Sequence, residues 1–303
     1  MAAAIELAAS GHQVQVFEKN SSFGGRGRSM KVEGYSFDMG PSWYWMPDVF
    51  EQFFNKHGRS TSDYFTLDRL DPSYRIFLEQ EILDAPASMR ETEALFEKKE
   101  PGSSVFLKKF LKEAKYKYEV GMSDFVTKPS LSLLEFVDLR ILKSLFRLEM
   151  LKSIETVIHR GIQNRQLRSW LSFPVLFLGA KPSDTPALYS LMNYADMELG
   201  TWYPRGGMTR LFEAFYKLAL EKGVQFSFDD PVESIGLSGK KASRLVSASG
   251  SHSFDYIISA ADYHHTDTVL LPREARQYTD AYWDSRKMAP GSLIFYLGVR
   301  RKL

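Results

Sequence analysis

The sequence predicts an α/β protein in which a Rossmann-like nucleotide-binding domain is interrupted by a largely helical domain. Near the N-terminus, a short apolar strand over Val14–Phe17 ends in Glu18 and leads into a turn rich in Ser and Gly, the order that dinucleotide-binding units use. The middle of the chain has helical periodicity over many residues. Beyond it, a Gly-Gly turn opens a helix followed by short strands, so the nucleotide-binding domain is expected to resume there.

Composition limits the class of protein. The 303 residues are 44% hydrophobic and 25% charged, which is typical of a globular chain with a sizeable core. A net charge of +2 gives no overall reason to expect nucleic-acid binding. The absence of cysteine excludes disulfides and thiolate metal ligands, and the six histidines lack metal-ligand spacing, so no metal is expected. The adjacent pair His264-His265 is expected at the surface.

The chain contains no apolar run as long as a membrane span and begins without a signal-peptide pattern. We therefore expect a protein that is soluble or peripherally bound. The location expected is the cytoplasm, with peripheral association at a membrane. The segment 131–151 has apolar residues at helical spacing, with Arg140, Lys143 and Arg147 nearly opposite. A basic amphipathic helix of this kind can lie on a membrane surface, and it can equally be a surface helix packed on its own core.

The first elements are those of a nucleotide-binding unit. Ala2–Ala9 is predicted as a helix that stops at Gly11, with its N-terminus toward a pyrophosphate. At the end of the following strand, Glu18 suits the ribose hydroxyls. Gly24 and Gly25 would let backbone N–H groups approach a phosphate or a flavin, and the neighbouring Arg26 would add positive charge.

The next elements follow from apolar patterns and turn residues. A hairpin is expected around Gly34 and a second turn at Gly40-Pro41-Ser42. From Trp43 to Phe54 the chain is first aromatic and then expected to be helical. Two strands and three helices are predicted after that: Tyr74–Leu78, a strand near Ile82, Glu91–Lys99, Ser103–Val120 and a long helical region over 131–159.

An apolar stretch at Leu167–Leu178 precedes the part of the chain in which the nucleotide-binding domain is expected to resume. A helix over Thr185–Tyr194 is predicted, with Asp184 or Thr185 as its cap and Pro186 in its first turn. Gly206-Gly207 then feeds the helix Thr209–Lys222, an arrangement suited to an anion or cofactor. Five strands are expected further on: Val224–Phe228, Pro231–Leu237, Arg244–Ala248, Phe254–Ile258 and Ser292–Val299. Asp262 is the expected N-cap of a helix, preceded by the small residues Ala260 and Ala261.

Glu18 followed by Gly24-Gly25-Arg26 resembles the FAD fingerprint of the flavin amine oxidase and carotenoid desaturase superfamily. Three longer strings resemble the bacterial-type phytoene desaturases, and the resemblance covers essentially the whole chain. They are FDMGPSWYWMP at 37–47, YPRGGM at 203–208 and ISAAD at 258–262. The resemblance implies truncation at both ends. The strand and the Gly-rich turn that precede the first helix in the family are expected to be missing, as is a C-terminal FAD contact.

The resemblance implies FAD as the cofactor and a set of residues around it. These residues are Glu18, Lys19, Gly24, Gly25, Arg26, Gly40, Pro41, Ser42, Tyr203, Pro204, Arg205, Gly206, Gly207, Met208, Val232, Ala260, Ala261 and Asp262. The backbone at Val232 is expected to meet the adenine. Residues 1–70 and 204–268 would form the FAD-binding domain, and 71–203 with 269–303 the domain that faces substrate and membrane.

The function implied is FAD-dependent desaturation of a lipophilic C40 polyene of the phytoene type. A hydrocarbon offers almost no hydrogen-bonding group, so its binding site needs aromatic and aliphatic walls. Trp43, Tyr44, Trp45 and Phe173–Phe177 suit such walls and suit an ordinary core equally well. No catalytic residue is assigned: Asp196 and Glu198 are possible, although exposed loop acids are the simpler interpretation.

Other functions remain open at this point. One is a different flavin enzyme of the superfamily, such as an amine oxidase or a carotenoid ketolase or isomerase, although the strings around Trp43 and Trp202 argue against an amine oxidase. Another is a non-catalytic fragment that binds lipid or a partner without flavin.

Overall fold

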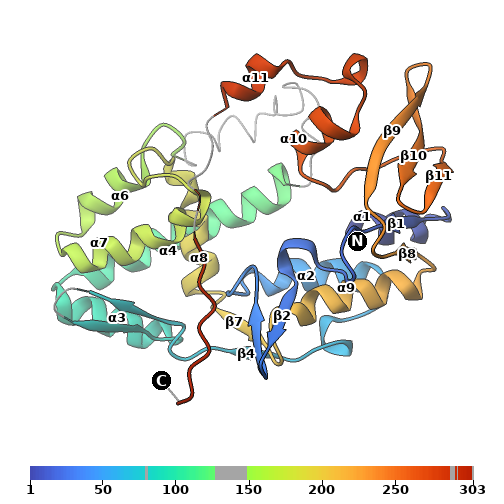
Figure 1. The fold of residues 1–303 in the computed structure, drawn as a ribbon. Helices are drawn as coiled ribbons and strands as arrows, with labels where there is room; N and C mark the ends of the chain where they lie inside the picture. Colours follow the sequence, from blue (N-terminus) through green and yellow to red (C-terminus); the bar gives the residue numbers. More distant parts are fainter. Residues whose placement is uncertain (79–80, 127–148, 287–290, 292, 302–303) are drawn as a thin grey trace.

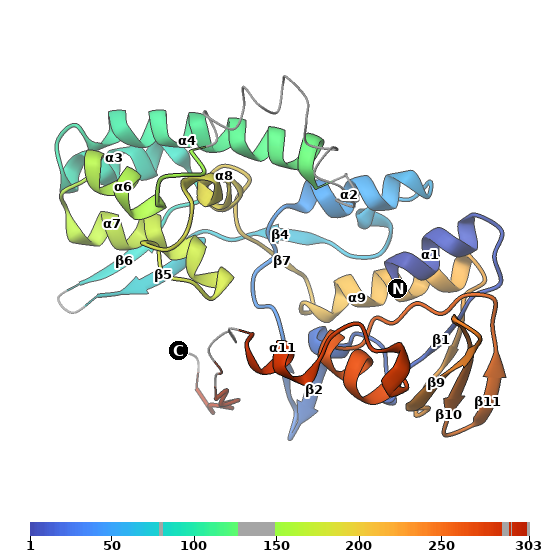
Figure 2. The same cartoon turned by 90° about the horizontal axis from the view of Figure 1, so that it is seen from above.

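The computed structural model describes residues 1–78, 81–126, 149–286, 291 and 293–301. Figures 1 and 2 show two lobes. Each lobe has its own hydrophobic core. One lobe carries α1, β1, β8 and α9, the elements predicted for nucleotide binding. The other carries α3, α4, α6, α7 and α8. This arrangement confirms the predicted mixture of an α/β domain with a largely helical one.

The nucleotide-binding lobe is built on a parallel strand pair. Strand β1 (Gln15–Phe17) pairs with β8 (Gln225–Ser227), and Val16 lies opposite Phe226. The helices α1 (Ala2–Ala9) and α9 (Thr209–Glu221) pack beside each other. Their apolar faces share a core with α2 (Pro47–Lys56). The buried members of this core include Ile5, Phe54, Leu211, Leu218 and Val224. The first helix and the strand that ends at Glu18 are thus confirmed.

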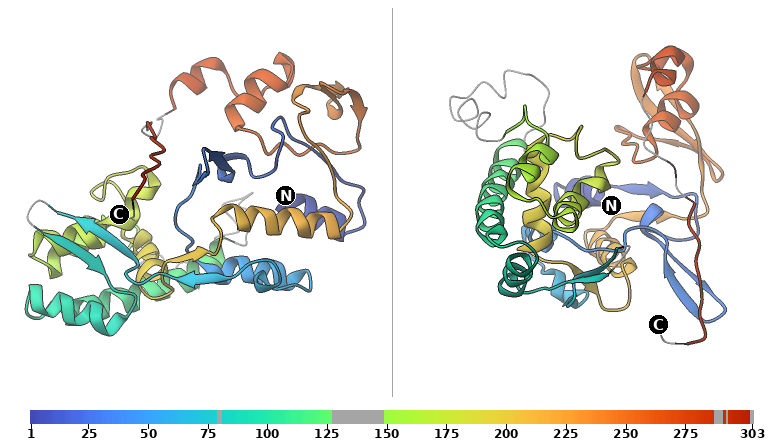
Figure 3. Two further views of the ribbon diagram at one scale, coloured as in Figure 1. Left: turned by 60° about the horizontal axis from the view of Figure 1, so that its bottom comes forward. Right: turned by 90° about the vertical axis from the view of Figure 1, so that its left-hand side faces the viewer.

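The predicted hairpin around Gly34 is confirmed as β2 (Ser29–Val32) and β3 (Tyr35–Asp38). Glu33 and Gly34 both have positive φ, 50° and 84°, as a two-residue hairpin turn requires. The same hairpin lies beside the segment 293–301 (Figure 3, right). The Tyr35 hydroxyl donates to the Val299 carbonyl at 3.2 Å.

A two-stranded antiparallel ladder joins the lobes (Figure 2). It consists of β4 (Leu67–Arg69), on which the chain leaves the nucleotide-binding lobe, and β7 (Trp202–Pro204), on which it returns. The backbone of Tyr44 extends the ladder by bonding to Trp202 in both directions. The domain limits predicted near residues 70 and 204 coincide with this ladder and stay a prediction.

The helical lobe packs amphipathic helices around a hairpin. Its helices are α3 (Met89–Lys99), α4 (Ser103–Val120), α6 (Ile154–Gly161), α7 (Arg165–Ser172) and α8 (Leu191–Met197). The hairpin is β5 (Tyr74–Phe77) with β6 (Ile82–Ala85). In α4, Leu107, Leu111, Ala114 and Tyr118 recur at helical spacing and are all buried. The predicted helices over 91–99 and 103–120 and both strands are confirmed.

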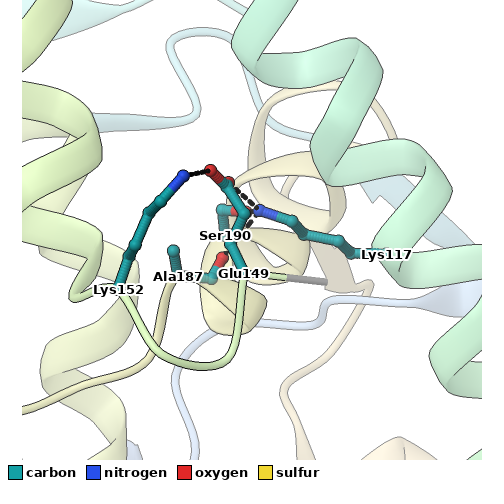
Figure 4. A network of polar contacts seen from close by, with 5 residues as sticks. All are labelled: Lys117, Glu149, Lys152, Ala187 and Ser190. Carbon is teal, nitrogen blue, oxygen red and sulfur yellow. Dashed lines mark hydrogen bonds and ion pairs between the residues drawn. The ribbon is translucent and has the colours of Figure 1, made fainter. Parts of the chain in front are cut away.

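The helical region expected over 131–159 is corrected in its C-terminal part, while residues 127–148 lie outside the described residues. Glu149 has a φ of 53°, and a turn over 149–153 precedes α6, so the helix does not run on to His159. Figure 4 shows what holds this turn. The buried ammonium of Lys117 on α4 donates to Glu149 Oε2 at 3.0 Å, to the Ala187 carbonyl at 3.0 Å and to Ser190 Oγ at 3.2 Å.

The carboxylate of Glu149 balances the positive charge of the buried Lys117, and it also accepts from the Lys152 ammonium at 3.1 Å. Burial raises the pKa of Glu149, but the hydrogen bonds and charges of Lys117 and Lys152 outweigh it and leave that pKa below its ordinary value.

We expect Lys117→Met to lower the free energy of unfolding by about 1–2 kcal/mol, since Glu149 keeps Lys152 as its partner and is partly exposed. Urea unfolding measures the loss. An unchanged midpoint in Lys117→Met would contradict this, and Lys115→Met, at an exposed ion pair of the same helix, is the control.

The helix predicted over 185–194 begins later than expected, and its cap assignment is wrong. A 3-10 turn, η6 (Ala187–Ser190), leads into α8, and Pro186 precedes it in an extended conformation. The Thr185 hydroxyl is buried and donates to the Lys181 carbonyl at 2.8 Å instead of capping the helix. The Ser153–Pro186 bridge keeps this stretch extended because it pairs with the start of α6.

The C-terminal strands form a small antiparallel sheet of β9 (Val232–Ser238), β10 (Lys241–Ser247) and β11 (Gly250–Ser253). The strands predicted over 254–258 and 292–299 are wrong as far as the structure describes them. Phe254 makes the last bond of the ladder, to the Ser243 carbonyl, and Tyr256 beyond it is 77% exposed. Residues 293–299 belong to no strand.

The remaining short elements connect these parts. They are η1 (Gly25–Gly27), η2 (Thr61–Asp63), η3 (Gly121–Phe125), η5 (Phe173–Leu178), α10 (Tyr263–His265), η7 (Thr266–Leu270), η8 (Arg273–Ala275) and α11 (Asp280–Asp284).

Candidate functional site

Glu18 lies where β1 ends, beside the connection from β8 to β9. Its N–H donates to the Ser227 carbonyl and its carbonyl accepts from the Asp230 N–H, so the backbone is held on both sides. The carboxylate atom Oε1 accepts from the Asn20 N–H at 2.9 Å and from the Asn20 side chain. Within the described part of the chain, Oε2 has no hydrogen-bond donor. One carboxylate oxygen therefore remains for a diol such as a ribose.

The glycine turn after Glu18 is packed too closely for other residues. Gly24 has a φ of 105°, and the Gly27 N–H donates to the Gly24 carbonyl at 2.8 Å. A Cβ on Gly27 would lie 2.1 Å from the ring of Phe212 on α9, and a Cβ on Gly40 would lie 2.1 Å from the Arg26 carbonyl oxygen. The turn therefore lies directly between helix α9 and the turn that begins at Gly40.

Asp38, at the end of β3, is the residue that sequence reasoning missed. Its carboxylate accepts from the Met208 N–H at 3.1 and 3.0 Å, at the N-terminus of α9, and from the Tyr203 hydroxyl. A carboxylate there is stabilised by the helix dipole. Burial and the neighbouring carboxylate of Asp38 raise the pKa of Tyr203 to about 12. The negative group at this helix N-terminus is thus supplied by the protein itself.

Gly207 makes room for that carboxylate. Its φ is 104°, and a Cβ would lie 3.1 Å from Asp38 Oδ1. Arg205 points elsewhere, since its guanidinium forms a two-pronged ion pair with Asp68 at 2.8 and 3.1 Å, exposed to solvent. Within the string at 203–208, Tyr203 and Met208 thus bind Asp38, and Arg205 binds Asp68. The contact of this string with a cofactor stays a prediction.

The other predicted residues are distributed around the same region. Arg26 lies 3.6 Å from Asp262 as an exposed ion pair, which links the glycine turn to the segment 260–262. Asp262 also caps α10 through the His265 N–H, as predicted. Val232 starts β9 opposite Ser247. Eleven of the predicted residues are solvent-exposed: Lys19, Gly25, Arg26, Gly40, Pro41, Ser42, Arg205, Gly206, Ala260, Ala261 and Asp262.

These positions fit a dinucleotide. Within the described residues, the N–H groups of Gly25 and Arg26 donate to no protein acceptor, and Gly25 has open space where a Cβ would be. Free donors beside an exposed guanidinium suit a pyrophosphate. Nothing comparable is present for a metal, because no group of three or more His, Asp and Glu within ligand distance occurs in the described part of the chain.

A second candidate region is an aromatic cluster where the two lobes meet. Trp43 lies 6.1 Å from Trp45, 5.8 Å from Tyr74, 5.3 Å from Phe173 and 4.9 Å from Phe177, centre to centre. Phe177 is 51% exposed, so the cluster reaches the surface. Tyr44, for which the sequence left a wall position and a core position open, belongs to the core of the nucleotide-binding lobe, with 1% exposure.

Behind this cluster lies Asp196, which corrects its interpretation as an exposed loop acid. It is on α8 and 2% exposed, whereas Glu198 is exposed as expected. Its carboxylate accepts from the Tyr74 hydroxyl at 2.6 Å and from the Thr201 hydroxyl at 3.2 Å. Burial raises the pKa of Asp196 to about 6, against the lowering effect of these two bonds. Periodicity does not reveal such a residue, because the apolar pattern of α8 is short.

Comparison with curated proteins gives relatives over nearly the full chain. The chain is 36% identical over 303 residues to a carotenoid 3,4-desaturase of Haloarcula japonica, covering 99% of this chain and 61% of that protein. It is 31% identical over 305 residues to a zeta-carotene-forming phytoene desaturase of Myxococcus xanthus, covering 100% and 58%. The chain thus spans about three fifths of these relatives' length. The resemblance to bacterial-type carotenoid desaturases is confirmed.

Solved structures agree on the fold. An oxidoreductase from Methanosarcina mazei has a TM-score of 0.58 at 15% identity, covering 93% of this chain and 61% of that one. A putrescine oxidase variant has a TM-score of 0.57 at 13% identity, covering 90% and 59%. A RAB GDI from Plasmodium falciparum has a TM-score of 0.55 at 12% identity, covering 87% and 63%. At such identities the likeness shows the fold alone.

The family comparison covers almost every residue. The model described as "Flavin containing amine oxidoreductase" matches residues 1–302. Its flavin agrees with the FAD predicted from Glu18 and the glycine turn. The chain belongs to the family of flavin containing amine oxidoreductases.

Proposed function

We propose that this chain forms part of an FAD-dependent carotenoid desaturase that dehydrogenates a long polyene. The observation that carries the proposal is the combination of a dinucleotide-type turn with an aromatic cluster at the meeting of the lobes. Two desaturase relatives support the substrate class. The domain limits proposed are 1–70 with 204–268 for FAD, and 71–203 with 269–303 for substrate.

We propose that groups of the nucleotide-binding lobe hold FAD. Glu18 Oε2 would accept from the ribose hydroxyls, and the N–H groups of Gly25 and Arg26 would donate to the pyrophosphate. The backbone at Val232 would meet the adenine. The remaining predicted contacts would come from three stretches: Gly40–Ser42, Tyr203–Met208 and Ala260–Asp262. When bound, the flavin supplies the oxidising chemistry by accepting a hydride.

The aromatic cluster is proposed to bind the hydrocarbon. A polyene has no polar group to recognise, so its binding relies on apolar area and on exclusion of water. Trp43 and Trp45 are stacked at an interplanar angle of 8°, and Phe177 meets both edge-on. Flat rings at fixed angles suit a planar conjugated chain better than flexible aliphatic side chains would.

Contact with a membrane is part of the proposal, because a C40 hydrocarbon partitions into lipid. No described helix combines the length and apolarity needed to cross a bilayer. The amphipathic segment 131–151 was the predicted contact, and its residues 131–148 lie outside the described part of the chain. In the described end of this segment, Met150 is 42% and Leu151 is 99% exposed, which supports an apolar surface at this end of the helical lobe.

The experiment expresses the protein in cells that accumulate phytoene. The chain is tested as it stands and also joined to the segments of the Haloarcula japonica relative that lie outside the match. Coloured, more conjugated carotenoids are expected, identified by chromatography and absorption spectra. Oxygenated or merely isomerised carotenoids would replace the proposal by a ketolase or an isomerase. Unchanged phytoene with soluble, flavin-loaded protein would refute it.

A further inference from the structure

The carboxylate of Asp196 is buried without a cation. Both of its oxygens accept from neutral hydroxyls: Oδ2 from Tyr74 and Oδ1 from Thr201. No Lys or Arg of the described residues forms an ion pair with it. The guanidinium of Arg69 lies against Gly200 instead and donates to the Ala87 carbonyl. An unpaired buried charge is costly, so such a residue is a functional-site candidate when it adjoins a binding region.

The two hydroxyls that bind Asp196 connect it to the aromatic cluster, because Tyr74 is a member of the cluster and Thr201 binds another member, Trp45. The Tyr74 hydroxyl, which donates to Asp196, also accepts from the Trp170 indole N–H at 2.8 Å. The Thr201 hydroxyl likewise accepts from the Trp45 indole N–H at 2.9 Å. Asp196 is therefore the acceptor at which two hydrogen-bond chains end, one through the Tyr74 hydroxyl and one through the Thr201 hydroxyl.

Two rings in these chains, Tyr74 and Trp45, are walls of the cluster. Tyr74 lies 5.8 Å from Trp43 and 5.3 Å from Phe173, and Trp45 stacks on Trp43 and meets Phe177. A carboxylate accepts from several donors, whereas a neutral amide has one oxygen and two donors of its own. Each hydroxyl already accepts one indole N–H, so an amide would match this site less well.

We propose that Asp196 is the positioning residue of the polyene site: by binding the Tyr74 and Thr201 hydroxyls, it holds the Tyr74 and Trp45 rings at the angle that admits a planar conjugated chain. This inference rests on the proposed function. The charge on Asp196 strengthens both hydrogen bonds relative to a neutral acceptor. The price in stability of keeping it buried is consistent with a role in the site.

The test measures polyene binding without turnover. A conjugated polyene that absorbs at the wavelength of tryptophan emission is added in detergent micelles to the 303-residue chain, and quenching of tryptophan fluorescence gives the apparent Kd. In the wild-type chain, quenching should saturate. In Asp196→Asn and Tyr74→Phe, the apparent Kd should rise about tenfold. Glu198→Gln, at an exposed acid two residues away, is the matched control and should bind as the wild type does.

A second readout separates positioning from folding. A carboxylate that served only the fold would lower the melting temperature in Asp196→Asn together with binding. Positioning predicts weaker binding with a melting temperature at neutral pH that is not reduced. Tyr74→Phe removes only a hydroxyl and keeps the test decisive if Asp196→Asn fails to fold.

The possible outcomes are distinguishable. Unaltered binding in Asp196→Asn or in Tyr74→Phe, or no quenching in the wild-type chain, overturns the inference. Saturating quenching in the wild type, lost in both variants, together with no desaturated product in cells, leaves the inference standing and refutes the proposed desaturase activity.

Discussion

Replacing Asp38 by alanine is expected to lower the free energy of unfolding by roughly 2–4 kcal/mol, because two hydrogen bonds to a charged acceptor are lost and their donors are left without a partner. One donor is the Met208 N–H at the start of α9, and the other is the Tyr203 hydroxyl. The loss also removes a negative group from a helix N-terminus. Both effects weaken the contact between the β2–β3 hairpin and α9.

The same substitution is expected to reduce flavin retention. The glycine turn that is proposed to hold the pyrophosphate packs against α9 and Gly40. Loss of the Asp38 contact with α9 is therefore expected to displace this turn. Urea unfolding gives the stability change, and absorbance after desalting gives the flavin bound, in the chain completed with the relative's segments. Asp84→Ala is the control, because its ion pair with Arg75 is exposed and should contribute no more than about 1 kcal/mol.

Tyr203→Phe adds a check on the mechanism. If the Asp38 carboxylate acts through Tyr203, the double variant should be less destabilised than the sum of the two single variants. Equal stability of Asp38→Ala and the wild type would show that the contact with α9 is not energetically important.

Asp196→Asn is expected to be more stable than the wild-type chain at neutral pH and to lose that advantage in acid. A rise of the folded-state pKa from 3.8 to about 6 corresponds to about 3 kcal/mol. Between these two pH values the folded state binds more protons than the unfolded state, so the stability of the wild type falls as pH rises. Below pH 3.8 the group is protonated in both states and this cost is absent.

The amide of the variant does not ionise, so it does not incur this cost. It loses part of a hydrogen-bond network, worth about 1 kcal/mol for one neutral bond, which is less than the charge cost above about pH 6. The measurement is the free energy of unfolding of both proteins from about pH 4 to about pH 8, with Glu198→Gln as control. A difference between the two proteins that does not change with pH would mean that Asp196 does not titrate in this window.

Local patterns account for the parts of the fold that sequence reasoning predicted well. The helix Ser103–Val120 follows Gly102, whose φ of 87° marks the break before it, and its apolar residues recur with helical spacing. The hairpin at Gly34 and the helix Ala2–Ala9 likewise depend on turn chemistry and composition within a few residues. Such elements need no distant partner to be recognised.

The errors arose where a distant partner decides the outcome. Residues 254–258 and 293–299 have strand-like apolar content, yet a strand exists only when its backbone groups pair with another strand. Pro186 lies in an extended stretch because it bridges to Ser153, which the local sequence does not reveal. The burial of Asp196 likewise depends on Tyr74, which is 122 residues away.

The sequence by itself determined the family, the strand that ends in Glu18 and the glycine turn after it, since these depend on residues within one short segment. Only the tertiary structure decided which groups meet. Asp38 and Met208 are 170 residues apart, and the indoles of Trp45 and Trp170 reach the same carboxylate through different hydroxyls. Contacts of this kind depend on how the two lobes fold against the β4–β7 ladder. No local pattern encodes them, because periodicity reports which face of an element is buried and not which partner buries it.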